Sequence, residues 1–287
     1  MPAGYLHPGY LDSLSEFGDP SVLPHSGGGV LSRAIPGTRW TDAISVYPLF
    51  FCTDWDSLPA DLEEETDWVS LTLVTEPLGH PCQVDFPDHF EFFKRHYLIE
   101  LDSPTISNRH WRNIRKAQTE VRVDRNPDVN SWCSLYTGLV QRRSITGIQR
   151  FSPGAFSAQF SVPGMGVFRA VHRGDVVAMA LFFQMGEVVY YHLGASSEAG
   201  YQVRGFYALF KAAIDHYASA GVRWMNLGGG AGLGDDPDGG LAQFKSGWAT
   251  TTLPTYLAGR IFDPDRYRKL AQGSGDYFPA YRSGRMP

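Results

Sequence analysis

The chain has 287 residues, of which 43% are hydrophobic and 19% charged, and its formal net charge is -5. These values exclude a largely disordered chain and a generally basic protein that binds nucleic acid over its whole surface. A chain of this length buries about 75% of its unfolded surface, so it needs no disulfide or structural metal to fold. No apolar run approaches the roughly 18 residues of a membrane-spanning helix.

The cysteines bear on the cellular compartment. Cys52, Cys82 and Cys133 form an odd, scattered set, which predicts reduced thiols in the cytoplasm. The first residues lack a basic region followed by an apolar one, so we expect no secretory signal. Neither a C-x-x-C pair nor an H-E-x-x-H motif occurs, and no metal site is predicted.

Residues 1–40 are rich in Pro, Gly and Ser, which predicts an irregular segment with one short helix near 11–17. Residues 41–150 alternate short strands with helices that follow Ser103-Pro104 and Asn126-Pro127, two capping signals. The predicted elements here are strands at 43–52, 68–75, 97–101 and 121–123, and helices at 58–66, at 103–119 and after 127.

From Gly166 the pattern changes to apolar runs separated by tight turns, which predicts an antiparallel meander of three strands. An apolar stripe containing Phe206, Phe210 and Tyr217 predicts the main helix of this region. The predicted elements are a helix from 153, strands at 167–172, 176–184 and 188–193, a helix at 204–220, a strand at 222–227, a helix around 245 and a strand at 251–257. This order predicts an α+β fold with the architecture of GNAT acyltransferases.

Three stretches of sequence carry a more specific resemblance. Residues 108–117 (NRHWRNIRKA) resemble an R-x-N-I-R-K-A helix, and residues 190–195 (YYHLGA), with Ser197, resemble a strand-to-loop segment. Residues 227–230 (LGGG) and 240–248 (GLAQFKSGW) resemble a C-terminal motif of the form D/L-G-G-G … G-L-x-x-F-K-x-G-F/W. In this order, over roughly residues 95–270, the chain is similar to Fem-like, GNAT-fold acyltransferases.

The resemblance implies two GNAT-like halves around a central cleft, a degenerate one at 41–150 and an acyltransferase half at 151–270, followed by a tail at 271–287. Members of the family transfer an acyl group to an amine, and many take it from aminoacyl-tRNA. It therefore implies an aminoacyltransferase with aminoacyl-tRNA as co-substrate and no other cofactor. The implied acceptor is the amine of a cell-wall precursor or of a peptide-like metabolite.

Lys245 is the predicted catalytic residue of the F-K-x-G-W motif. Aminolysis of an ester or thioester develops negative charge on the carbonyl oxygen, and a fixed cation there lowers the barrier. The resemblance implies that this lysine meets the acyl-donor end, with Phe244 beside it as a substrate contact. The alternative is a solvent-exposed lysine on an amphipathic helix.

Arg112, Arg115 and Lys116 are predicted to bind phosphates. Their spacing of i, i+3 and i+4 places them on one face of a helix. Such a face suits the phosphates of tRNA, of a nucleotide-linked acceptor or of coenzyme A. The alternative is a solvated surface face.

Residues 202–207 (QVRGFY) bear on the identity of the donor. GNAT proteins that bind coenzyme A use Q/R-x-x-G-x-G/A, in which small residues let backbone N–H groups reach the pyrophosphate. Gln202 and Gly205 fit and are predicted to bind substrate, but Tyr207 stands where Gly or Ala is required. This departure favours aminoacyl-tRNA, while acyl-CoA and a non-catalytic GNAT-like binding module stay open as alternatives.

Tyr191 and His192 lie at the end of a predicted strand, next to the cleft of this fold. His192 is a candidate general base, because an unperturbed imidazole has a pKa of about 6.5, and Tyr191 is a candidate substrate contact. Only one of them can face the site, since adjacent strand residues point to opposite faces. Asp235 is a candidate for binding the acceptor amine. The alternatives are a packing histidine and a surface turn.

Overall fold

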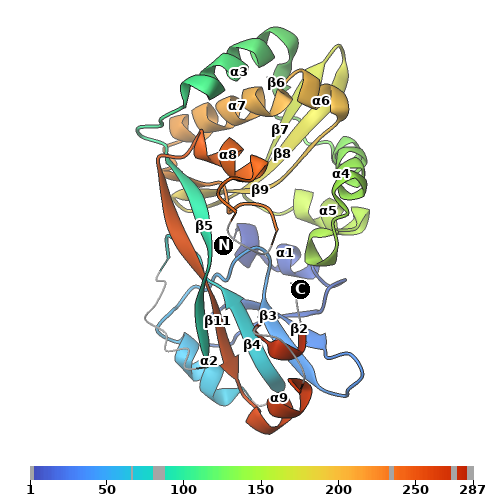
Figure 1. The fold of residues 1–287 in the computed structure, drawn as a ribbon, viewed down its shortest axis with the longest axis vertical. Helices are drawn as coiled ribbons and strands as arrows, with labels where there is room; N and C mark the ends of the chain where they lie inside the picture. The colour runs from blue at the N-terminus through green and yellow to red at the C-terminus, as the bar shows by residue number, and fades with distance from the viewer. Residues whose placement is uncertain (1–2, 66, 80–87, 233–235, 273–276, 283–287) are drawn as a thin grey trace. The chain divides into compact units, whose positions relative to one another are not determined.

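The computed structural model describes residues 3–65, 67–79, 88–232, 236–272 and 277–282. The chain forms two compact units, which we call the central unit (residues 95–253) and the flanking unit (residues 4–94 and 254–287). Two long strands, β5 (His89–Glu100) and β11 (Thr251–Ile261), contain the boundaries between these units. The elements are labelled in Figure 1.

The central unit is built on a mixed sheet with the strand order β5-β10-β9-β8-β7-β6. β7, β8 and β9 form the predicted antiparallel meander, while β10 pairs in parallel with β9 and antiparallel with β5. The strands are β6 (Arg122–Asp124), β7 (Met165–His172), β8 (Asp175–Met185), β9 (Val188–Ser196) and β10 (Trp224–Asn226).

Helices cover both faces of the central sheet. α3 and α7 lie side by side (Figure 1), and the apolar stripe of α7 packs Phe210 against Phe182 of β8. α4 and α5 pack on the other face, where Gln159 of α5 reaches His192 of β9. The helices are α3 (Asn108–Glu120), α4 (Val129–Arg143), η2 (Gly147–Gln149), α5 (Pro153–Phe160), α6 (Glu198–Gln202), α7 (Gly205–Ser219) and α8 (Gly240–Ser246).

The flanking unit contains the strand order β1-β2-β3-β4-β11-β5. β3 and β4 pair in parallel, and the β1–β2, β2–β3 and β4–β11 pairs are antiparallel. Its core includes Phe50, Leu62 and Leu71. The elements are η1 (Gly4–Leu6), α1 (Pro8–Asp12), β1 (Asp19–Val22), β2 (Gly29–Ala34), β3 (Thr41–Ser45), α2 (Leu58–Glu64), β4 (Trp68–Val74), α9 (Pro264–Leu270) and η3 (Ala280–Arg282).

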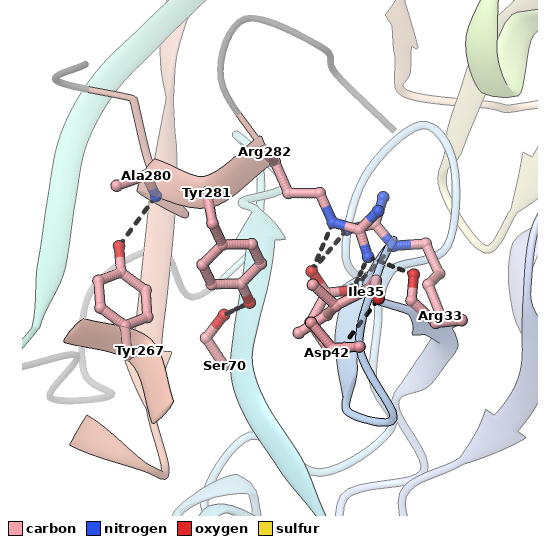
Figure 2. Close-up of polar contacts among 10 residues, drawn as sticks. Arg33, Ile35, Asp42, Ser70, Tyr267, Ala280, Tyr281 and Arg282 are labelled. Atoms are coloured by element: carbon pink, nitrogen blue, oxygen red, sulfur yellow. Dashed lines mark hydrogen bonds and ion pairs between the residues drawn. The ribbon is translucent and has the colours of Figure 1, made fainter. Parts of the chain in front are cut away.

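A buried carboxylate ties the C-terminal turn η3 to the strands of the flanking unit (Figure 2). Arg282 donates from Nε and Nη2 to the two carboxylate oxygens of Asp42, each at 2.8 Å, and Arg33 donates from Nε to Oδ1 at 3.2 Å. Beside this cluster the Tyr281 and Ser70 hydroxyls lie 2.7 Å apart. Asp42 is only 1% exposed. A buried carboxylate must be paired, and here two guanidinium groups pair with it.

The first 40 residues correct one expectation. They were expected to be irregular around a helix at 11–17, but they contain η1, α1, β1 and β2. Apolar side chains that are scattered in the sequence, such as Tyr5, Leu11 and Val30, are all buried. Their burial stabilises regular structure that composition alone does not indicate.

Several element boundaries also differ from the predictions. α3 begins after Ser107, whose Oγ accepts from the His110 amide, rather than at Ser103. α4 begins after Asp128, which caps the Ser131 amide, rather than after Asn126. β5 and β11 are longer than predicted, and α9 was not predicted. The boundaries between the compact units fall at 94/95 and 253/254. The two GNAT-like halves at 41–150 and 151–270 remain a prediction.

Candidate functional site

A pocket of about 590 Å³ lies between the exposed face of α3 and the start of α7. Five of its lining side chains are cationic and none is acidic, and within the described residues none of these five forms an ion pair. The structure thus brings together the three predicted phosphate-binding residues. The lining residues are Arg109, Arg112, Asn113, Arg115, Lys116, Arg204 and Tyr207. Such a concentration of unpaired positive charge suits a ligand with several phosphate groups.

The N-terminus of α7 forms one wall of this pocket. Its first residue follows Arg204, which takes the left-handed conformation (φ 58°) and provides no side-chain cap. The first N–H groups of a helix lack intrahelical partners and favour anions. Gly205 is buried against Ala170 and Ala178 of the sheet, and Gln202 is exposed at the end of α6. Arg204 was not predicted as a phosphate-binding residue, although its position directly before Gly205 could have indicated that role.

His110 of α3 forms a hydrogen bond that links this helix to the last turn of α8. Its Nε2 donates to the Phe244 carbonyl oxygen at 2.8 Å, and its Nδ1 accepts from the Ser107 hydroxyl at 2.9 Å. Burial lowers the pKa of His110, which favours the neutral ring, whose Nδ1 accepts in this way. The ring meets Trp248 edge to face at 4.9 Å, and a Cβ at Gly247 would collide with it. The glycine and the tryptophan of F-K-x-G-W therefore position the helix of the other motif.

Lys245 points into the central unit rather than into bulk water. It is 6% exposed, its Nζ donates to the Gly229 carbonyl oxygen at 2.6 Å, and it lies 5.8 Å from the centroid of the Tyr191 ring. The alternative of a solvent-exposed lysine is therefore excluded. A cation held in place before the reaction can stabilise developing negative charge without reorganisation. The catalytic role of Lys245 stays a prediction.

His192 faces away from Tyr191, as the alternation along a strand requires. The Tyr191 ring packs against α7, while the His192 ring packs against Phe183 and Phe151 with Nε2 3.4 Å from Gln159 Oε1. A bulge in the β8–β9 ladder falls at His192. Burial lowers the pKa of His192 to about 3, which makes it a poor base at neutral pH. These observations favour the packing alternative over the predicted general base.

The other predicted positions contribute less to a site. Phe244 packs into an aromatic cluster with Tyr207 and Phe210. Asp235 lies outside the described residues, and the neighbouring Asp236 closes a turn by accepting from the amides of Asp238 and Gly239. The described part of the chain contains no group of three or more His, Cys, Asp or Glu that could hold a metal ion. None of its helices has the length and apolar character needed to cross a membrane.

Comparison with known proteins places this site in a family context. Residues 107–246 match the family model of the acetyltransferase (GNAT) domain. No curated protein sequence matches the chain. In fold it is similar to the crystal structure of FemX, at 11% identity and a TM-score of 0.66, over 94% of this chain and 95% of that one. It is also similar to L-PGS from Bacillus licheniformis, at 16% identity and a TM-score of 0.61, over 88% and 92%.

These findings confirm the predicted class of protein. The chain has a GNAT fold of the Fem-like kind, and residues 107–246 match a GNAT domain in sequence as well. The protein is an acyltransferase. The matched segment contains every residue that lines the basic pocket, and it contains Lys245.

Proposed function

We propose that this acyltransferase forms an amide bond by transferring an aminoacyl group from aminoacyl-tRNA to an amine acceptor. The observation that carries the proposal is the pocket lined by five cations and no acid, on a chain whose net charge is -5. The cationic row from Arg109 to Lys116 extends about 10 Å along α3, at ~1.5 Å per residue. A row of this length suits successive phosphates of a polynucleotide.

In the proposed reaction the acceptor nitrogen attacks the carbonyl carbon of the aminoacyl ester, and the ribose oxygen leaves. The pocket holds the phosphates near the charged end of the tRNA, and the Lys245 ammonium stabilises the negative charge on the carbonyl oxygen. Holding both substrates together supplies a further part of the acceleration. The acceptor is a cell-wall precursor or a peptide-like metabolite, and the reaction takes place in the cytoplasm, where charged tRNA is available.

Acyl-CoA is the second candidate donor. Gln202 and Gly205 fit the coenzyme A pattern, and the uncapped start of α7 faces the pocket, as a pyrophosphate contact requires. Tyr207 counts against this candidate, because its side chain forms part of the pocket wall at the position where such proteins have Gly or Ala. The Fem-like fold supports aminoacyl-tRNA, the donor that the family resemblance implies.

A donor comparison tests the proposal. The purified protein is incubated with tRNA charged with radiolabelled amino acids, or with labelled acetyl-CoA, in the presence of trialanine and Nα-acetyl-lysine as amine probes. We expect labelled amides from charged tRNA alone. Products from acetyl-CoA alone would replace the proposal with the second candidate. Product from neither donor would favour the non-catalytic binding module.

A further inference from the structure

The side chain of Tyr207, on the first turn of α7, forms part of the wall of the cationic pocket. Three rings from elsewhere in the chain pack against its ring. His110 of α3 and Phe244 of α8 meet it edge to face, at 5.0 Å and 5.3 Å between ring centroids, and Trp248 lies 6.2 Å away. Aromatic pairs at such distances favour defined geometries, so folding sets the position of the Tyr207 ring before a ligand binds.

The hydroxyl group of Tyr207 is available to a ligand. The residue is half-buried, and within the described ranges no side chain or backbone group forms a hydrogen bond with this hydroxyl. Four arginines and one lysine line the same pocket, so the hydroxyl belongs to a wall to which phosphate is attracted. A tyrosine hydroxyl donates to phosphate oxygens, and a hydrogen bond to a charged oxygen is roughly twice as strong as one between neutral groups.

The unpaired amides at the start of α7 are not part of the pocket wall. The amides of Gly205 and Phe206 form no hydrogen bond within the part of the chain that the structure describes, and such amides are the groups that hold a pyrophosphate. The described residues that line the pocket include Arg204 and Tyr207, on either side of these two, but neither Gly205 nor Phe206. The Tyr207 amide already donates to the Arg204 carbonyl oxygen at 2.9 Å. A ligand in the pocket therefore meets side chains here rather than free backbone amides.

We infer that Tyr207 determines which donor the enzyme accepts. Its hydroxyl donates a hydrogen bond to a phosphate oxygen of the bound tRNA, and its ring occupies the space through which the pyrophosphate of acyl-CoA would approach the start of α7. The phosphodiesters of tRNA can be bound by side chains alone, because their charged oxygens are accessible along the strand. This inference rests on the proposed function and assigns its choice of donor to one residue.

Two substitutions separate the role of the hydroxyl from that of the ring. Tyr207→Phe removes the hydroxyl and should weaken binding of charged tRNA by about 10-fold or more, the usual effect of losing a hydrogen bond to a charged group, without strengthening binding of coenzyme A. Tyr207→Leu also shortens the side chain and should strengthen binding of coenzyme A by about 10-fold or more, because the obstruction is removed. Fluorescence anisotropy with charged tRNA and calorimetric titration with coenzyme A measure both affinities on the full chain.

Tyr201 provides the matched controls. This tyrosine of α6 is 55% exposed and is not among the described residues that line the pocket. Tyr201→Phe and Tyr201→Leu should leave both affinities unchanged. Thermal unfolding shows whether each variant is folded, and Tyr207→Phe keeps the packed ring, so it tests the inference even where the leucine variant is unstable.

Transfer measurements connect binding to the reaction. In Tyr207→Leu the ratio of kcat/KM for charged tRNA to that for acetyl-CoA should fall by about 10-fold or more. Wild-type tRNA affinity in Tyr207→Phe, or a folded Tyr207→Leu that binds coenzyme A no better than the wild type, would overturn the inference. The proposed function would still stand if the wild type transfers from charged tRNA alone. Wild-type transfer from acetyl-CoA alone, or from neither donor, would overturn both.

Discussion

The ammonium of Lys245 lies 2.6 Å from the carbonyl oxygen of Gly229, and this hydrogen bond joins α8 to the loop that follows β10. The lysine is thereby held at the carboxyl end of a central strand before any substrate is bound. A cation whose position is set by folding needs no reorganisation during the reaction, which is the condition for strong transition-state stabilisation. The relationship leads to a direct test.

Lys245→Met is expected to lower the rate of transfer about 100-fold, because losing one oxyanion donor costs ~10²–10³ in rate. Methionine fills the buried space without a charge. The measurement is single-turnover transfer from charged tRNA to trialanine. Lys269→Met, an exposed position on α9, is the control. Transfer at the wild-type rate by a correctly folded Lys245→Met protein would leave this lysine with a structural role only.

Arg112→Gln combined with Arg115→Gln is expected to weaken tRNA binding and to make it less sensitive to salt. Each lost phosphate contact should reduce the slope of log K against log salt concentration by about 1. Fluorescence anisotropy over a salt series measures this slope. Arg268→Gln serves as control, since this arginine on α9 is 75% exposed and already pairs with Asp265. An unchanged slope in the double variant would show that this face of α3 does not contact phosphates.

His192 should make the stability of the protein depend on pH. Burial lowers its pKa to about 3 in the folded state, against about 6.5 in the unfolded state. Below pH ~6.5 the unfolded state binds a proton that the folded state does not. The free energy of unfolding should therefore fall as the pH falls from ~6.5 towards ~3, by about 1.4 kcal/mol for each pH unit.

Urea unfolding of the wild type and of His192→Phe, at pH values from about 7.5 to about 5, measures this contribution. The phenylalanine variant lacks the titrating group, so the stability of the wild type relative to the variant should decline by about 2 kcal/mol between pH ~6.5 and pH ~5. Comparing the two proteins cancels the titration of the other histidines. A difference that stays constant over this range would contradict the burial of a neutral ring.

Asp42→Ala should lower the free energy of unfolding by about 3–5 kcal/mol, the usual effect of removing one partner from a buried ion pair. The variant leaves Arg33 and Arg282 uncompensated, with side chains only 10% and 17% exposed. Asp215→Ala removes a carboxylate that is 58% exposed and paired with Lys211, and it should cost less than about 1 kcal/mol. Equal effects in urea unfolding would mean that the Asp42 cluster contributes no more than a surface pair.

Local patterns in the sequence were sufficient to predict much of the central unit. The meander of β7, β8 and β9 follows from apolar runs separated by tight turns, and α7 follows from one apolar stripe. Arg112, Arg115 and Lys116 could be assigned to one face because helical spacing relates neighbours along the chain. Such features depend on residues a few positions apart, so they can be read without a tertiary structure.

Only the tertiary structure decided which residues form a site. The contact of His110 with Phe244, the addition of Arg204 to the pocket, and the packing of Tyr207 against His110 each join segments far apart in the chain. Burial likewise lowers the pKa of His192 to about 3, which favours a packing role over the predicted role of general base. Long-range contacts and desolvation leave no periodic signal in the sequence, because they arise only when distant segments fold against each other.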